Sequence, residues 1–121
     1  MKKRLIILGS TGSIGTQALE VIREQIDSFE LVGLCANQNE ALLNEQVREF
    51  RVSKMLLARG DSERVANWVE ELDADLVLVA ISGTAGLLPT LAAIRSGKNI
   101  ALANKETLVM AGELVMAEVY E

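Results

Sequence analysis

A glycine-rich segment near the start of the chain has residue types and spacing that could bind phosphate. It reads Gly9-Ser10-Thr11-Gly12-Ser13-Ile14-Gly15 and directly follows a short apolar run. Between a strand and a helix, glycines let the backbone turn and approach a pyrophosphate, whose charge is stabilised by exposed amides and by the helix dipole. The segment therefore predicts a dinucleotide-binding loop, although its first glycine lies one position further away than in G-x-G-x-x-G.

The residues that begin the following helix strengthen this interpretation. No carboxylate occurs between Gly9 and Gln17, although Asp and Glu are favoured in the first turn of a helix. A first turn without acidic residues suits an anionic ligand. The alternative is a tight turn between a strand and a helix in which Ser13 is an ordinary N-cap.

A second polar segment, Ala36 to Asn39, bears on which dinucleotide would bind. An NAD site usually carries Asp or Glu about 20 residues beyond the glycines, at the end of the second strand, where it holds a ribose hydroxyl. Here that strand leads into Asn37, Gln38 and Asn39, without a carboxylate or an arginine. The segment therefore favours NADP over NAD, through amide donors and a helix N-terminus. The alternative is that Asn37 or Asn39 only caps the next helix.

A third segment, Asn104 to Glu106, follows the last predicted strand. Asn104 can cap the last helix and Glu106 suits its first turn, so both have structural explanations. Lys105 does not, because a cation in a first turn opposes the helix dipole by about a few tenths of a kcal/mol or more. An anionic ligand nearby would explain its position, and the alternative is a solvated lysine on the surface.

Alternating apolar and amphipathic runs predict the elements that position these segments. We expect strands at residues 4–8, 29–36, 54–57, 76–80 and 99–102. The first two helices are expected at about 13–25 and 39–50. A third follows the cap Asp61 and contains Val65, Val69 and Leu72, and a fourth contains Leu87, Leu91 and Ile94 and ends at Gly97. A last helix is expected from Asn104 onward. This alternation indicates a Rossmann-like, doubly wound α/β fold, with a parallel sheet and helices on both faces. Ligands of such folds bind beyond the carboxyl ends of the strands, where all three polar segments would lie.

The composition restricts the class of protein and its partners. The 121 residues are 50% hydrophobic and 24% charged, with a formal net charge of −5, which is typical of one globular domain but short for an enzyme that also encloses a substrate. Scattered Lys and Arg residues argue against a nucleic-acid partner, and no apolar run approaches the roughly 20 residues needed to cross a membrane. A single cysteine, Cys35, indicates a cytoplasmic protein and is interpreted as a buried strand residue rather than a nucleophile. The absence of histidine excludes His-ligated metals and His-dependent triads within this chain.

Two longer motifs, Gly83–Ile94 and Ala101–Val109, accompany Gly9–Thr16 and Ala36–Asn39. Together the four segments resemble the amino-terminal domain of the 1-deoxy-D-xylulose 5-phosphate reductoisomerase family, over essentially the whole chain. The resemblance implies an enzyme that uses NADPH and a divalent metal (Mg²⁺, Mn²⁺ or Co²⁺). Such an enzyme rearranges 1-deoxy-D-xylulose 5-phosphate and reduces the product to 2-C-methyl-D-erythritol 4-phosphate, in non-mevalonate isoprenoid biosynthesis. It also implies a homodimer for the full-length form.

The resemblance assigns roles by position. The pyrophosphate side of NADPH would be contacted by Thr11, Gly12, Ser13 and Ile14. The adenosine end would be held by Asn37, Gln38 and Asn39, and the nicotinamide end by Asn104 and Glu106. Lys105 would contact the phosphosugar substrate. Gln38 stands where relatives have a basic residue, which weakens the expected selection of a 2′-phosphate.

In the resembling family, the metal-binding carboxylates, the substrate-phosphate residues and a catalytic flap lie in a central domain beyond the position of Glu121. We therefore expect residues 1–121 to form an NADPH-binding domain, with the central catalytic domain and the C-terminal domain absent and with no catalytic residue or metal ligand of its own. Such a chain is expected to bind NADPH without turning over substrate. The alternatives are a non-catalytic nucleotide-binding sensor module and a truncated domain without useful ligand affinity.

Overall fold

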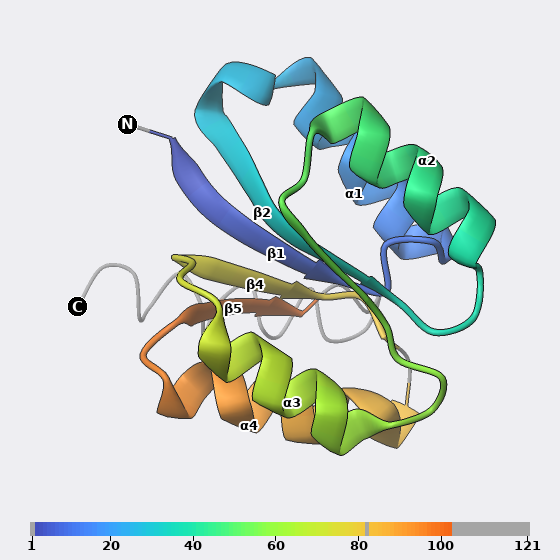
Figure 1. Cartoon of the computed structure of the whole chain (residues 1–121). Coiled ribbons are helices and arrows are strands. Elements are labelled where there is room, and N and C mark those ends of the chain that lie inside the picture. Colours follow the sequence, from blue (N-terminus) through green and yellow to red (C-terminus); the bar gives the residue numbers. More distant parts are fainter. Residues whose placement is uncertain (1, 82, 103–121) are drawn as a thin grey trace.

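A computed structural model describes the chain over residues 2–81 and 83–102, which form a single five-stranded sheet between two pairs of helices (Figure 1). The strands are β1 (Lys3–Leu8), β2 (Phe29–Ala36), β3 (Lys54–Leu57), β4 (Leu76–Val79) and β5 (Asn99–Leu102). The helices are α1 (Ser13–Glu24), α2 (Glu40–Phe50), α3 (Ser62–Glu71) and α4 (Leu87–Arg95), with short 3₁₀ helices η1 (Ile26–Ser28) and η2 (Gly83–Gly86). Each strand and helix predicted in this part of the chain is confirmed, and β2, β3 and β5 have the predicted bounds. The last predicted helix, from Asn104, lies outside the described residues.

The strands lie in the order β3-β2-β1-β4-β5 and every neighbouring pair is parallel. In the centre of the sheet, Leu8 of β1 pairs with Cys35 of β2 on one side and with Val79 of β4 on the other. Helices α1 and α2 cover one face, while α3 and α4 cover the opposite face (Figure 1). The predicted doubly wound fold is therefore confirmed. Its strand order reverses beside β1, which is where ligands bind in open α/β sheets.

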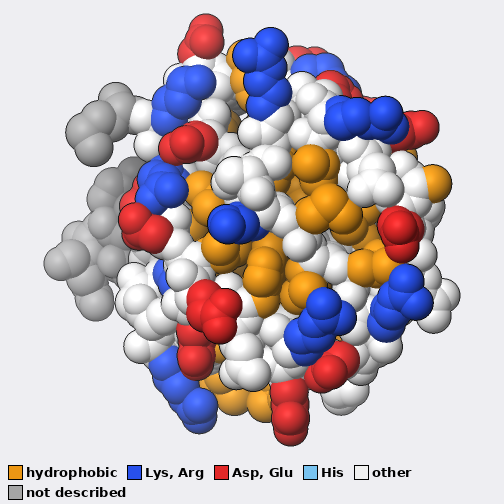
Figure 2. Space-filling view, viewed as in Figure 1, with side chains coloured by type: hydrophobic (Ala, Val, Ile, Leu, Met, Phe, Trp, Pro, Cys, Tyr) orange, Lys and Arg blue, Asp and Glu red, His pale blue; other side chains and the backbone are white. Residues whose placement is uncertain are grey.

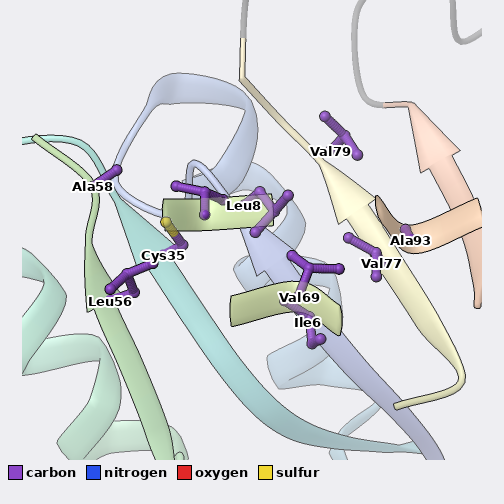
Figure 3. Packing of buried hydrophobic residues seen from close by; sticks show 10 residues of the cluster. Ile6, Leu8, Cys35, Leu56, Ala58, Val69, Val77, Val79 and Ala93 are labelled. Carbon is purple, nitrogen blue, oxygen red and sulfur yellow. The ribbon is translucent and has the colours of Figure 1, made fainter. Parts of the chain in front are cut away.

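The apolar part of β1, from Leu5 to Leu8, is buried on both faces, as its sequence predicts. Leu5 and Ile7 belong to the cluster beneath α1 and α2, whereas Ile6 and Leu8 belong to the cluster beneath α3 and α4. Val69 of α3 packs in the second cluster (Figure 3). The alternation follows from the two-residue repeat of a strand. Because both faces are packed, the pairing register of β1 is fixed. The position of the loop after Leu8, at the carboxyl ends of the strands, is therefore fixed as well.

Side chains cap two of the helices but not the first. The Oδ1 atom of Asn39 accepts a hydrogen bond of 3.2 Å from a backbone amide of α2, and Oδ1 of Asp61 accepts one of 3.1 Å from α3. Helix α1 instead begins after Gly12, with no side-chain cap. The alternative in which Ser13 is the N-cap is therefore wrong, whereas capping by Asn39 is confirmed.

Helix α4 is predicted correctly, but its large apolar residues do not mark its buried face. Leu87, Leu91 and Ile94 are all exposed. The residues that α4 buries are Pro89, Ala92 and Ala93. Small side chains let a helix approach its neighbours closely, and α4 packs extensively against α3.

The surface carries charges of both signs. On the face shown in Figure 2, Lys and Arg side chains are interspersed with Asp and Glu, and apolar side chains are exposed between them.

A bidentate ion pair joins α1 to α2, with Arg23 Nε 2.6 Å from Glu49 Oε2 and Nη2 2.9 Å from Oε1. Hydrogen bonding to the guanidinium lowers the pKa of the Glu49 carboxyl. None of the described helices is long and apolar enough to span a membrane.

Two valines on different helices test whether the core beneath α3 and α4 is tightly packed. Val69 is fully buried and Val21 is 54% exposed. Val69→Ala is expected to lower the free energy of unfolding by about 2 kcal/mol, because it removes two buried methyl groups and leaves a cavity. Val21→Ala, the matched control, should change it by less than about 0.5 kcal/mol. Urea denaturation measures both, and equal losses would contradict this packing.

Candidate functional site

The loop after β1 is anchored to the end of β2. The backbone amides of Gly9 and Ser10 both donate hydrogen bonds to the carbonyl oxygen of Cys35, at 2.8 and 3.0 Å. Gly9 adopts a φ of +86°, in the left-handed region that favours glycine. A Cβ atom at this position would lie 2.6 Å from the carbonyl oxygen of Ala80, beyond β4. The chain can therefore turn between the ends of β2 and β4 only with glycine here.

The other two glycines of the loop play different parts. A Cβ atom on Gly15 would lie 2.0 Å from the Gly9 carbonyl oxygen, so the first turn of α1 packs directly onto the loop. A Cβ atom on Gly12 would meet only that same oxygen, at an ordinary 3.6 Å. Gly15 is thus required by packing within the protein. Gly12 faces space that a ligand could use.

The beginning of α1 is suited to an anion. Its N-cap is Gly12, its first turn contains no acidic residue, and no side chain caps its amides. The Thr16 hydroxyl donates to the Ser13 carbonyl oxygen at 3.0 Å and so does not reach the front of the helix. Backbone amides left without side-chain partners at a helix N-terminus, together with the helix dipole, favour a phosphate group.

A buried glutamine of α2, which the sequence reasoning did not identify, forms a hydrogen bond with the first loop. Gln46 of α2 is 6% exposed, and its Nε2 donates to the Ser10 carbonyl oxygen at 2.9 Å. Ser10 itself is fully buried. A polar side chain within the otherwise apolar buried face of an amphipathic helix was the available signal, but its partner depends on how α2 docks against the loop.

The segment after β2 pairs with the segment after β3. Asn37 accepts hydrogen bonds at its backbone oxygen from the Arg59 amide, at 2.9 Å, and at Oδ1 from the Gly60 amide, at 2.8 Å. Asn39 is occupied as the cap of α2, and Gln38 has an exposed side chain. Of the three predicted adenosine-binding residues, Asn37 therefore has its side chain fixed toward the neighbouring loop.

A cavity of about 340 Å³ opens at this edge of the sheet. Its walls include Gly9, Thr11 and Gly12 from the first loop, Asn37 after β2, and Gly60 and Ser62 after β3. The structure thus brings together Thr11, Gly12 and Asn37 of the predicted site. The cavity walls do not include four other predicted site residues that are close in sequence to the lining residues: Ser13, Ile14, Gln38 and Asn39.

Three other predicted site residues lie in the last part of the chain. Asn104, Lys105 and Glu106 lie outside the described residues, so their roles stay predictions. Within residues 2–81 and 83–102, no three His, Cys, Asp or Glu side chains come together in a way that could hold a metal ion.

Arg59, which the sequence reasoning did not identify, lies between Ala58 and Gly60, two residues that line the cavity. It follows β3, and its guanidinium Nη2 lies 3.5 Å from Oε2 of Glu40, the first residue of α2. The segment directly after β2, Asn37 to Asn39, contains no basic residue. The parallel pairing of β2 with β3 brings the two strand ends together, and that pairing was the available signal.

Cys35 forms part of the cavity wall without being reactive. Its side chain is buried, and this burial raises the pKa of its thiol to about 12. The interpretation as a buried strand residue is confirmed. Only a thiolate is a good nucleophile, so at neutral pH this thiol is inert.

The two loop glycines give a first test of the site's construction. Gly15→Ala is expected to destabilise the protein by about 2 kcal/mol or more, because its methyl group collides with backbone. Gly12→Ala should cost less than about 1 kcal/mol, the usual difference between glycine and alanine at an N-cap. Thermal or urea unfolding gives the order, and a Gly12→Ala protein less stable than Gly15→Ala would contradict the geometry.

The Cys35 thiol gives a second test. At pH 8 it should react far more slowly with a disulfide reagent such as DTNB in the folded chain than in urea. An unfolded thiol ionises above its ordinary pKa of about 8.5, so the folded state should also lose stability as the pH rises from there toward 12. Equal labelling rates in the two states would show that the thiol is accessible.

Comparison with known proteins identifies relatives along nearly the entire chain. The family model for 1-deoxy-D-xylulose 5-phosphate reductoisomerase matches residues 5–112. The reductoisomerase of Leifsonia xyli is 53% identical over 113 residues, covering 93% of this chain and 30% of the relative. That of Caldanaerobacter subterraneus is 48% identical, covering 98% of this chain and 36% of the relative. The chain thus spans about a third of the length of these curated relatives.

Solved structures agree with this relationship. The reductoisomerase of Zymomonas mobilis in complex with NADPH has a TM-score of 0.64 and 32% identity, over 99% of this chain and 36% of that one. A myo-inositol 2-dehydrogenase from Lactobacillus plantarum, with a TM-score of 0.68 but 18% identity over 84% of this chain and 28% of that one, shares the Rossmann-like fold alone. The chain therefore belongs to the 1-deoxy-D-xylulose 5-phosphate reductoisomerase family.

Proposed function

We propose that residues 1–121 form the NADPH-binding domain of a 1-deoxy-D-xylulose 5-phosphate reductoisomerase. The observation that carries the proposal is the cavity at the point of strand reversal, whose walls combine the Gly9–Gly12 loop with Asn37. Its location is the one that doubly wound folds use for dinucleotides. The family relationship supports NADPH as the occupant, because the Zymomonas mobilis relative was solved with that cofactor.

The described residues suit the phosphate end of a dinucleotide. Helix α1 presents first-turn amides that no side chain caps, and Gly12 leaves room for close approach. We assign the pyrophosphate to Thr11, Gly12, Ser13 and Ile14, and the adenosine end to Asn37, Gln38 and Asn39. When bound, NADPH supplies the hydride for reduction. The contribution of these residues is to bind and orient it.

The remaining assignments follow the family resemblance. We assign the nicotinamide end to Asn104 and Glu106, and contact with the phosphosugar substrate to Lys105. The reaction is rearrangement and reduction to 2-C-methyl-D-erythritol 4-phosphate, in isoprenoid biosynthesis, by a cytoplasmic enzyme that is a homodimer at full length. A solved relative carries magnesium together with NADPH. No described residue of this chain is assigned to a divalent metal.

Titration of the 121-residue chain with NADPH and NADH, by calorimetry or nucleotide fluorescence, tests the proposal. NADPH should bind the more tightly of the two. Gly12→Ala should weaken NADPH binding at least about tenfold while the protein stays folded, because its methyl group occupies space next to the pyrophosphate. Val21→Ala is the control and should leave binding unchanged, because Val21 is exposed, lies in the second half of α1 and does not line the cavity.

Two outcomes would contradict the proposal. Absence of binding to either dinucleotide would favour a domain without useful affinity. Binding that Gly12→Ala does not affect would place the nucleotide away from the first loop.

A further inference from the structure

The proposed cofactor differs from NADH by a 2′-phosphate, and the end of β2 offers no cation to hold it. In dinucleotide sites an arginine near this strand end accommodates the phosphate. Asn37, Gln38 and Asn39 are all neutral. A cation must therefore come from a neighbouring element, if the site selects NADPH strongly.

The loop after β3 is held against the end of β2 by consecutive backbone amides. The Ala58 amide donates to the Ala36 carbonyl oxygen at 2.7 Å, and the Arg59 amide donates to that of Asn37 at 2.9 Å. The Gly60 amide completes the contact through Asn37 Oδ1, at 2.8 Å. Ala58 and Gly60 both line the cavity. Arg59 is thus fixed between two residues of the cavity wall.

The backbone at Arg59 is itself unusual. Its φ is +50°, in the left-handed region that a residue with a side chain seldom adopts. Such a conformation is unfavourable for a residue with a side chain and persists only where surrounding contacts impose it. Here the hydrogen bonds to Asn37 impose it, and the guanidinium is directed toward the first turn of α2.

The present partner of the guanidinium is weakly held. Arg59 Nη2 lies 3.5 Å from Glu40 Oε2, and the two side chains are 70% and 58% exposed. Exposed ion pairs of this length contribute little, so a phosphate can displace the carboxylate. The other nearby carboxylate, Asp61, is engaged through Oδ1 as the cap of α3.

We propose that Arg59 binds the 2′-phosphate of NADPH, exchanging its contact with Glu40 for two charge-assisted hydrogen bonds to phosphate oxygens. The planar guanidinium fits this bidentate geometry. Arg59 then takes the role of the basic residue that is absent at Gln38, and the loop after β3 determines cofactor selection. The inference rests on the proposed function.

The test compares NADPH and NADH binding in matched arginine variants of the 121-residue chain. Arg59→Gln should weaken NADPH binding about tenfold or more, the usual effect of losing a charge-assisted hydrogen bond, and leave NADH binding within about twofold. Arg51→Gln is the control. Arg51 is also exposed and has a φ of 54°, but it precedes β3 and so lies near the amino ends of the strands, whereas the cavity lies at their carboxyl ends. Arg51→Gln should change neither affinity. Circular dichroism establishes that both variants are folded.

Adenosine 2′,5′-bisphosphate and 5′-AMP give a second measurement. The unmodified chain should prefer the bisphosphate, and Arg59→Gln should remove that preference. If Arg59→Gln leaves NADPH binding unchanged, or weakens NADPH and NADH equally, the role of Arg59 is refuted while the proposed function stands. If the unmodified chain binds neither dinucleotide, both fail together.

Discussion

The site depends on one backbone contact, the paired donation from the Gly9 and Ser10 amides to the Cys35 carbonyl oxygen. It closes the chain sharply at the carboxyl end of the central strand, where β2 and β4 both end. Because Gly9 has a positive φ and no side chain, the loop fits beside Ala80, and because Gly15 has none, α1 can begin directly against it. The direction of α1, and so of its first amides, follows from that contact.

The fold could be predicted well because its signals are local. Buried parallel strands read as short apolar runs, and the polar residues Ser28 and Asn37 flank β2 on either side. The caps at Asn39 and Asp61 are equally local. The buried face of α4 could not be read in this way, because Ala92 and Ala93 are buried for their small size while larger apolar residues stay exposed.

The site was predictable only in part, for a related reason. Thr11, Gly12 and Asn37 follow directly from the ends of β1 and β2, and the structure places them around one cavity. Gln46 contacts the first loop through the docking of α2, and Arg59 is held next to Asn37 through the pairing of β3 with β2, which are contacts between distant parts of the chain. Because the ends of adjacent parallel strands meet, the residues after one strand do not define the site alone.

The central claim is that a dinucleotide lies across the first loop, with its adenosine end between the segments after β2 and β3. The most direct measurement is NMR chemical-shift mapping of backbone amides in the 121-residue chain during addition of NADPH. The account predicts that the largest changes occur at residues 9–14, 37–39 and 58–62. Changes confined to other parts of the chain, or no changes at saturating NADPH, would contradict it.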